Sequence, residues 1–181
     1  AGRYRIEVMV RDRLSGRQGR YRQYVEVEDY AREGLRLSEL ELAWHVNEPA
    51  PQGKFSKGDA QVIPIPPRTY RQGKSVFVYY EVYNLKPDEF GQTHYKVEYT
   101  VGPRKGRKNT GIITQLVKVL TSEKQQVAVG YEQVGQQESE KTFTELDLSK
   151  AYVGKHYMEV QVTDLVSGKT ASRKATFLVA E

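Results

Sequence analysis

Hydrophobic and polar residues alternate with a period of two along most of this chain. In the segments 4–10 and 95–101, every second residue is apolar and the residues between them are mostly polar. This alternation is typical of a β-strand with one buried face and one face in water. The segment 76–83 is apolar on both faces, which indicates a central strand that is covered on both sides.

Gly, Pro and Asn residues interrupt the alternation at intervals typical of a β-sandwich. The segment 35–46 also fits a helix, because Leu37, Leu40 and Trp44 have helical spacing. It alternates from Leu40 to Val46 as well, and we favour a strand there. We expect strands at 3–12, 20–28, 36–46, 60–66, 76–84, 93–101, 111–120, 127–134, 142–148, 155–164 and 172–180.

The composition agrees with a polar, tyrosine-rich sheet protein. Hydrophobic residues make up 38% of the 181 residues, and 13 residues are Tyr, which packs well on a pleated sheet. A chain of this length can bury one sizeable core, or one domain and part of another. We therefore predict an all-β fold: an immunoglobulin-like or fibronectin-like antiparallel β-sandwich with an N-terminal β-hairpin.

An internal repeat relates the two ends of the chain. Residues 1–29 align with residues 153–181 without a gap, at a shift of 152 positions, and chance similarity of two hairpins is the alternative. Each copy reads as a strand, an Asp-x-x-Ser-Gly turn and a second strand, in which Asp and Ser bond turn amides and Gly supplies a positive φ. The identical residues are Gly2/Gly154, Glu7/Glu159, Val8/Val160, Val10/Val162, Asp12/Asp164, Ser15/Ser167, Gly16/Gly168 and Val27/Val179.

The repeat predicts the domain organisation. The second copy is the last hairpin of a sandwich that spans residues 36–181, and residues 30–35 are a linker. We expect residues 1–29 to be the last hairpin of a preceding sandwich repeat whose other strands are missing. A lone hairpin is marginally stable in water, so we expect it to dock on the main domain or to join a neighbouring molecule's sheet by self-association.

Four segments occur in an order that resembles the C-terminal region of bacterial GWxTD-domain proteins: 37–43, 54–58, 62–64 and 78–85. The closing segment 154–179 is similar to the last hairpin of bacterial immunoglobulin-like or fibronectin-like sandwiches. The Gly-Trp-x-Thr-Asp motif itself does not occur in the sequence, so no functional residue carries over. The resemblance implies a sandwich fold in an exported protein of the periplasm or cell envelope, and it implies no activity.

Charge and composition exclude several classes of protein. The net charge is +5, with both signs interspersed, and no apolar stretch approaches the roughly 20 residues that a membrane span needs. Without Cys there is no disulfide, thiol nucleophile or thiolate metal site.

No catalytic or metal-binding motif stands out. His45, His94 and His156 lie far apart and lack the spacing of metal ligands, and the sequence holds no nucleophile elbow, phosphate-binding glycine loop or calcium loop. We predict no catalytic residue, no metal and no cofactor. Glu81 interrupts an apolar strand, and a buried carboxylate needs a partner. We expect a neighbouring-strand Lys, Arg or Tyr hydroxyl to pair with it; a binding role is the alternative.

Two loops are candidate contacts with a partner. Phe90 lies beside two acids in the loop 86–92, where it is either exposed or tucked under its own loop. The basic run Arg104, Lys105, Arg107 and Lys108 could grip an anionic surface, although a solvated turn that discourages edge aggregation is favoured. Nucleic acid is not expected, because this run contains no aromatic residue on which bases could stack.

These observations predict a non-catalytic protein-interaction or spacer module of a bacterial exported or envelope protein. The protein partner cannot be named from the sequence. The alternative is a carbohydrate-binding module, in which Tyr79 and Tyr83 form an aromatic platform for a glycan.

Overall fold

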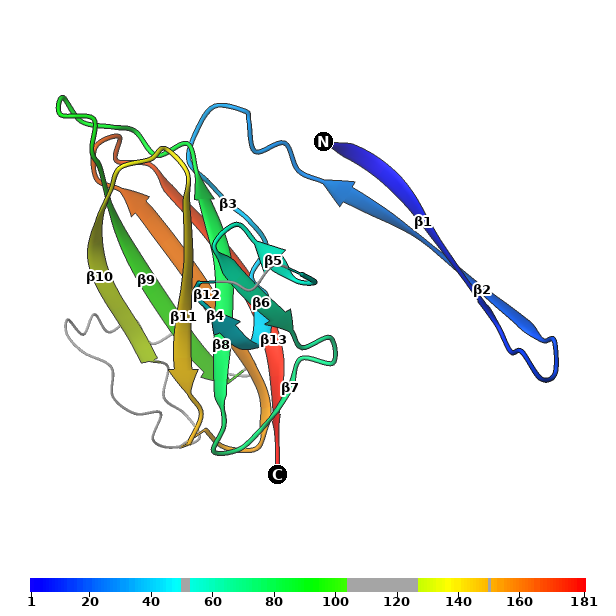
Figure 1. The fold of residues 1–181 in the computed structure, drawn as a ribbon. Coiled ribbons are helices and arrows are strands. Elements are labelled where there is room, and N and C mark those ends of the chain that lie inside the picture. The colour runs from blue at the N-terminus through cyan, green and yellow to red at the C-terminus, as the bar shows by residue number, and fades with distance from the viewer. Residues whose placement is uncertain (50–52, 104–126, 150) are drawn as a thin grey trace. The chain divides into compact units, whose positions relative to one another are not determined.

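A computed structural model describes residues 1–49, 53–103, 127–149 and 151–181 of the chain (Figure 1). These residues form strands, turns and loops, and none of them is helical, which confirms the all-β prediction. They divide into two compact units, Ala1–Glu33 and Gly34–Glu181. No helix in the described residues has the length and apolar character that crossing a lipid bilayer requires.

The first unit is a two-stranded antiparallel sheet. Strand β1 (Gly2–Arg11) pairs with β2 (Gln18–Val27) in one unbroken register. All ten residues of β1 are exposed, and they include the large apolar side chains of Ile6, Val8 and Val10.

The second unit contains two sheets. The first has the strand order β10-β9-β12-β13-β7, in which β7 runs parallel to β13 and all other neighbours are antiparallel. Its strands are β7 (Thr69–Arg71), β9 (Thr93–Pro103), β10 (Val127–Gly135), β12 (Gly154–Asp164) and β13 (Thr170–Ala180).

The second sheet has the order β11-β8-β4-β6-β5, with β3 also paired to β8. Its strands are β3 (Arg36–Leu37), β4 (Glu41–Asn47), β5 (Ser56–Lys57), β6 (Ala60–Pro64), β8 (Ser75–Tyr83) and β11 (Glu140–Asp147). Strand β8 lies between β11 and β4 and is largely buried, as its apolar character on both faces predicts.

One core lies between the inner faces of the two sheets, so the unit has a sandwich-like arrangement. From the sheet of β8, this core takes Leu42, Val76, Val78, Tyr80 and Val82. From the sheet of β12, it takes Tyr95, Val97, Tyr99, Met158, Val160, Val162, Phe177 and Val179.

Three tyrosine hydroxyl groups form a chain of hydrogen bonds in this core. The hydroxyl of Tyr80 on β8 bonds that of Tyr99 on β9 at 2.5 Å, and Tyr99 bonds Tyr131 on β10 at 2.9 Å. Burial raises the pKa of Tyr80 and of Tyr99 well above the ordinary value. The chain of hydroxyls therefore crosses from one sheet to the other and gives the buried oxygen atoms of Tyr80 and Tyr99 the partners that a buried polar group requires.

Two sequence predictions need correction. The expected strand 36–46 is broken into β3 and β4, and a register shift between Ala43 and His45 turns Trp44 to an exposed position, against the expected alternation of buried residues. Strands β5 and β7 are absent from the expected set, because two or three residues are too few to show a period. The expected strand 111–120 lies outside the described residues.

Asp164 fastens the β12–β13 turn to another loop of the sandwich. Its carboxylate accepts the N–H of Val166 and the hydroxyl of Ser167 within the turn, and it also accepts the backbone N–H of Lys86 at 3.0 Å. The residue is only 1% exposed. Burial raises the pKa of this carboxyl, but the hydrogen bonds outweigh burial and hold the pKa below its usual value.

We predict that Asp164→Ala destabilises the sandwich by about 1–3 kcal/mol, because the N–H groups of Lys86 and Val166 and the hydroxyl of Ser167 all lose their acceptor. The folded-state pKa is lowered, so the carboxylate stabilises the fold fully above the unfolded pKa of about 3.9, and this contribution disappears as pH falls through the folded pKa. Urea unfolding at neutral and acidic pH measures both effects. Asp12→Ala, at the matching but exposed turn, is the control and should leave sandwich unfolding unchanged.

Candidate functional site

A cluster of tyrosines and charged groups lies on the outer face of β8, opposite the core. We call Glu41, Lys57, Tyr79, Glu81 and Tyr83 the outer-face cluster. Tyr79, Glu81 and Tyr83 share this face because they are two residues apart on one strand. Glu41 on β4 pairs with Tyr79 across the ladder, and Lys57 is on β5.

Hydrogen bonds and ion pairs connect this cluster. The Tyr79 hydroxyl donates to Glu81 Oε1 at 2.6 Å, and the Tyr83 hydroxyl donates to Glu81 Oε2. Lys57 Nζ lies 2.5 Å from Glu41 Oε2 and 5.2 Å from the centre of the Tyr79 ring. Every charged member therefore has an opposite charge or a hydroxyl against it.

The electrostatics of Glu81 follow from these contacts. Partial burial raises the pKa of its carboxyl, but the hydroxyls of Tyr79 and Tyr83, and then the charges of Lys141 and Lys57, hold the pKa below its usual value. Burial and the hydrogen bond to Glu81 raise the pKa of Tyr79. At neutral pH the cluster therefore contains an ionised Glu81 that accepts from two neutral phenols.

The sequence predicts a Tyr hydroxyl as one partner type for Glu81, and the structure contains two. The two tyrosines come from the same strand as Glu81, whereas the expectation was a neighbouring strand. The expected cation on a neighbouring strand is present as well, because Lys141 on β11 lies directly opposite Glu81 and its charge lowers the pKa of the carboxyl. The periodicity of β8 contains this signal, because residues two apart on a strand share a face. Lys57 is not found by sequence reasoning, because β5 is too short to be detected.

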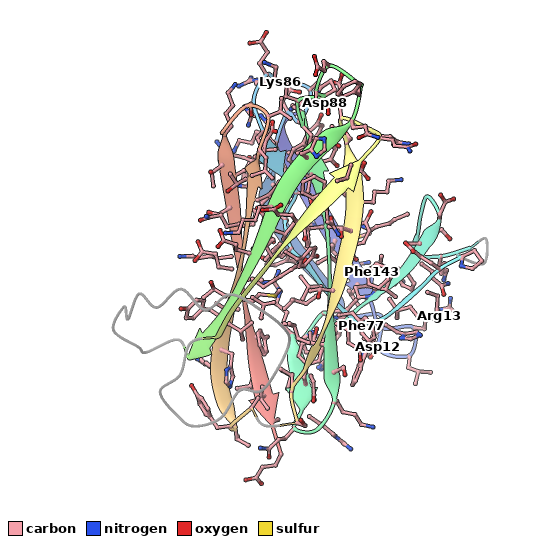
Figure 2. All side chains as sticks on the ribbon, turned by 90° about the vertical axis from the view of Figure 1, so that its left-hand side faces the viewer. Asp12, Arg13, Phe77, Lys86, Asp88 and Phe143 are labelled. Atoms are coloured by element: carbon pink, nitrogen blue, oxygen red, sulfur yellow. The ribbon has the colours of Figure 1, made fainter. Side chains whose placement is uncertain are left out.

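The arrangement does not provide the sugar platform that the alternative function needs at Tyr79. The Tyr79 residue is only 3% exposed, so almost no ring surface is left for a sugar to stack on. Tyr79 instead belongs to a small second apolar cluster with Val46 and Val62, and Phe77 and Phe143 pack against it. Figure 2 shows Phe77 and Phe143 on β8 and β11.

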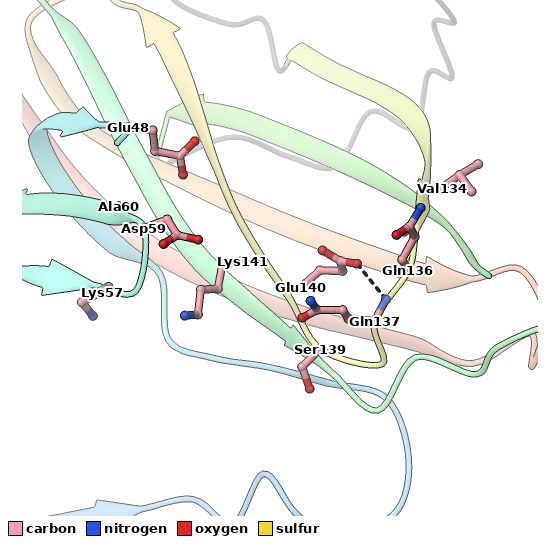
Figure 3. A pocket seen from close by; sticks show the side chains of 11 residues that line it. Glu48, Lys57, Asp59, Ala60, Val134, Gln136, Gln137, Ser139, Glu140 and Lys141 are labelled. Carbon is pink, nitrogen blue, oxygen red and sulfur yellow. Dashed lines mark hydrogen bonds between the residues drawn. The ribbon is translucent and has the colours of Figure 1, made fainter. Parts of the chain in front are cut away.

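A hollow of about 510 Å³ lies beside the cluster, between the β5–β6 turn and the β10–β11 turn (Figure 3). Its lining is mainly charged and amide side chains: Glu48, Lys57, Asp59, Gln136, Gln137, Ser139, Glu140 and Lys141, with Ala60, Val134 and Gly135. The Glu140 carboxylate accepts the backbone N–H of Gln137 at 3.3 Å. This hollow is open and mixed in charge, unlike the mostly apolar, enclosed pockets that bind small molecules.

Phe90 is the most exposed large apolar side chain of the sandwich among the described residues, with 80% of its surface in solvent. It does not tuck under its own loop. The turn that carries it is ordered by Asp88, whose carboxylate accepts the N–H groups of Phe90 at 2.9 Å and Gln92 at 2.8 Å. The other carboxylate oxygen lies 2.9 Å from Nε2 of His94 on β9.

The same contacts set the charge of this turn. The hydrogen bond from Gln92 lowers the pKa of Asp88, burial opposes this, and the contacts with His94 and Phe90 lower it further. Asp88 and Lys86 lie at one end of the sandwich (Figure 2), where Lys86 also bonds Asp164. The 88–92 turn is therefore tied both to β9 and to the segment that holds the β12–β13 turn.

The structure does not bring the three histidines together. His94 contacts Asp88, His45 contacts the edge of the Phe77 ring, and the buried His156 lies 2.9 Å from the carbonyl oxygen of Tyr152. Where the chain is described, no three His, Cys, Asp or Glu side chains are grouped so that they could hold a metal ion. The basic run Arg104, Lys105, Arg107 and Lys108 lies outside the described residues.

The sequence matches no protein-family model, and no curated protein matches it as a relative. Neither comparison therefore adds a function to the geometry of these sites.

We predict that Glu81→Gln destabilises the sandwich by about 1 kcal/mol, because two phenols lose an ionised acceptor that is partly solvated. The folded pKa of Glu81 is lowered, so its contribution is present above the unfolded pKa of about 4.3 and is lost as pH falls through the folded pKa. Urea titration of the variant across this range should therefore show a weaker pH dependence than the parent protein.

Glu145→Gln is the matched control, since Glu145 is exposed on the neighbouring strand β11. Equal losses of stability in the two variants would show that the outer-face cluster has no structural role.

Proposed function

We propose that residues 34–181 form a non-catalytic protein-interaction or spacer module that presents Phe90 to a protein partner. The observation that carries the proposal is the geometry of the 88–92 turn, where the exposed side chain of Phe90 projects from a backbone that is held by hydrogen bonds. Single exposed apolar residues are common on protein surfaces. Phe90 differs from these because its N–H donates to the Asp88 carboxylate, which His94 also contacts, so its backbone is held in place before a partner binds.

A fixed aromatic side chain is well suited to recognition. Aromatic anchors that fill a partner's pocket dominate the energy of many interfaces, and preorganisation reduces the entropy lost on binding. Glu89 is exposed next to Phe90, and Asp88 is ionised at neutral pH. The partner that fits this turn has an apolar pocket with basic groups at its rim.

The hydrogen-bonded carboxylates of the sandwich favour the same non-catalytic function. Catalytic carboxylates commonly have environments that push their pKa values apart towards acid and base roles. Here the pKa of each of Glu81, Asp88 and Asp164 is lowered, and each carboxylate accepts hydrogen bonds that hold strands or turns in place. These groups behave as structural acceptors.

The finer fold type and the cellular setting are part of the proposal. Two mostly antiparallel sheets around one core, closed by a C-terminal hairpin, suit an immunoglobulin-like or fibronectin-like sandwich. The resemblance of 37–85 to the C-terminal region of GWxTD-domain proteins is what supports the proposed setting in the bacterial periplasm or cell envelope. Tandem modules of this kind space other domains apart and expose their end loops.

We expect Phe90→Ala to reduce capture of a specific protein from bacterial envelope extracts by about tenfold or more, because a central aromatic anchor typically contributes 2 kcal/mol or more. Stability should change by less than about 0.5 kcal/mol, since the ring is solvated. Cross-linking, affinity capture and mass spectrometry with the parent and variant proteins measure the difference.

Phe55→Ala is the control, because Phe55 is another exposed phenylalanine, 53% in solvent, on a different loop. Undiminished capture of every partner by Phe90→Ala would rule out the turn as the contact. Glycan-array binding that disappears in Tyr83→Ala would instead support the carbohydrate-binding alternative.

A further inference from the structure

The hairpins β1–β2 and β12–β13 have the same backbone pairing. Gly2 pairs with Val27 at the open end of the first hairpin, and Gly154 pairs with Val179 at the open end of the second. Each hairpin continues without a slip for ten residue pairs, so every pair of one corresponds to a pair of the other at the shift of 152 positions. The sequence repeat is therefore also a repeat of register.

The two turns also have the same hydrogen bonds. Asp12 and Asp164 each accept, through Oδ1, the N–H two residues later, at 2.8 and 3.0 Å. Each accepts the hydroxyl of the Ser three residues later, at 2.7 and 2.5 Å. Gly16 and Gly168 both have a φ of 70°, a conformation that favours glycine. The surroundings of the two turns differ, because Asp12 is exposed and Asp164 is buried.

The same face of each hairpin is apolar. In β12 the inward residues Met158, Val160 and Val162 have no exposed surface. The matching residues of β1 are Ile6, Val8 and Val10, which are 48%, 48% and 67% exposed.

The outward faces match as well. Glu7 pairs with Arg22 at 2.9 Å, and at the corresponding positions Glu159 pairs with Lys174 at 3.1 Å. The charged face is thus solvated in both hairpins, and the apolar face is covered only in β12–β13.

The hairpin β12–β13 has neighbouring strands on both edges, and the hairpin β1–β2, as far as the structure describes the chain, lacks them. Strand β12 pairs antiparallel with β9, and β13 pairs parallel with β7. In the described part of the chain, β1 and β2 pair only with each other. Asp164 also accepts the N–H of Lys86. Asp12 has the corresponding carboxylate, in the same turn geometry.

We propose that β1–β2 is the closing hairpin of a second sandwich of the same kind, and that its apolar face is the surface on which that sandwich docks. The partner adds a β9-like strand antiparallel to β1 and a β7-like strand parallel to β2. It covers Ile6, Val8 and Val10 with a β8-like sheet. A loop N–H of the partner bonds Asp12, as the N–H of Lys86 bonds Asp164.

The partner that covers the apolar face of β1–β2 is a sandwich that lacks its own closing hairpin. In residues 34–181 the position of that hairpin is filled by β12–β13, which is held on both edges and buries its apolar face in the core. A second copy of that sandwich would therefore have to give up its own hairpin before it could accept β1–β2.

The partner is a related sandwich and not an identical one. The buried Ala175 corresponds to Gln23, and the buried His156 corresponds to Tyr4. A buried Gln needs a hydrogen-bond partner, so the second sandwich must supply a polar group opposite Gln23 that the sandwich of residues 34–181 has no need of.

A hairpin graft tests the proposal in the full chain. Residues 153–181 are replaced by the sequence of residues 1–29, and a second graft carries Gln23→Ala in the grafted hairpin to match Ala175. We expect at least the second graft to unfold cooperatively by thermal circular dichroism, with a melting temperature within about 10 °C of the parent protein. Failure of both grafts to give a cooperative transition overturns the proposal.

Two neighbouring residues provide a matched control for the buried face. In the folded graft, Val8→Asp puts a charge into the core and should lower the melting temperature by about 10 °C or more. Met9→Asp, on the solvated face, should shift it by about 2 °C or less. Equal effects of the two substitutions would show that the hairpin does not close a sandwich through its apolar face.

Discussion

The burial of one face of β12–β13 is the interaction on which the rest of the sandwich depends. Strand β12 is paired on both edges, so it joins β9 and β10 to β13 and β7 in a single sheet. Its inward residues Met158, Val160 and Val162 lie fully buried in the core opposite the other sheet. Each such side chain contributes on the order of 1.5–3 kcal/mol by leaving water. A short hairpin has no other comparable source of stability, because its backbone hydrogen bonds largely replace bonds to water.

The polar groups of the sandwich are arranged around this core and support it. Tyr80, Tyr99 and Tyr131 pair their hydroxyls with one another, and Glu81 and Asp164 accept hydrogen bonds that hold β8 and the last turn in place. These groups are committed to the fold. In the function that we propose, a partner contacts the Phe90 turn of the sandwich. The apolar face of the first hairpin is the second surface that we propose for docking.

Much of the architecture could be predicted because a strand with one buried face has an alternating sequence, and the turn residues separate one strand from the next. The repeat was visible for a related reason, since the Asp-x-x-Ser-Gly turn needs specific side chains at specific positions. The bulge near Trp44 could not be predicted, because alternation assumes an unbroken register. The short parallel pair of β7 with β13 also carries no local signal.

The candidate sites were only partly predictable. Glu81 was recognisable as an acid within an apolar strand, but the partners of its side chain depend on which face each tyrosine takes. The turn that carries Phe90 includes a contact between Asp88 and His94, which joins a loop to the following strand. Such contacts are set by three-dimensional packing, and a single sequence records only the residue types that take part.

Amide hydrogen exchange of the intact chain in dilute solution is the most direct test of the central claim. The hairpins β1–β2 and β12–β13 have matching registers and turn bonds, so the sandwich around β12, which covers its apolar face and pairs its other edge with β9, is what should separate their protection. We predict that the hydrogen-bonded amides of β12 exchange more slowly than those of β1 by a factor on the order of a hundred or more. Equal protection of the two strands in the monomer would contradict the account, because the hairpin would then be stable without a sandwich around it.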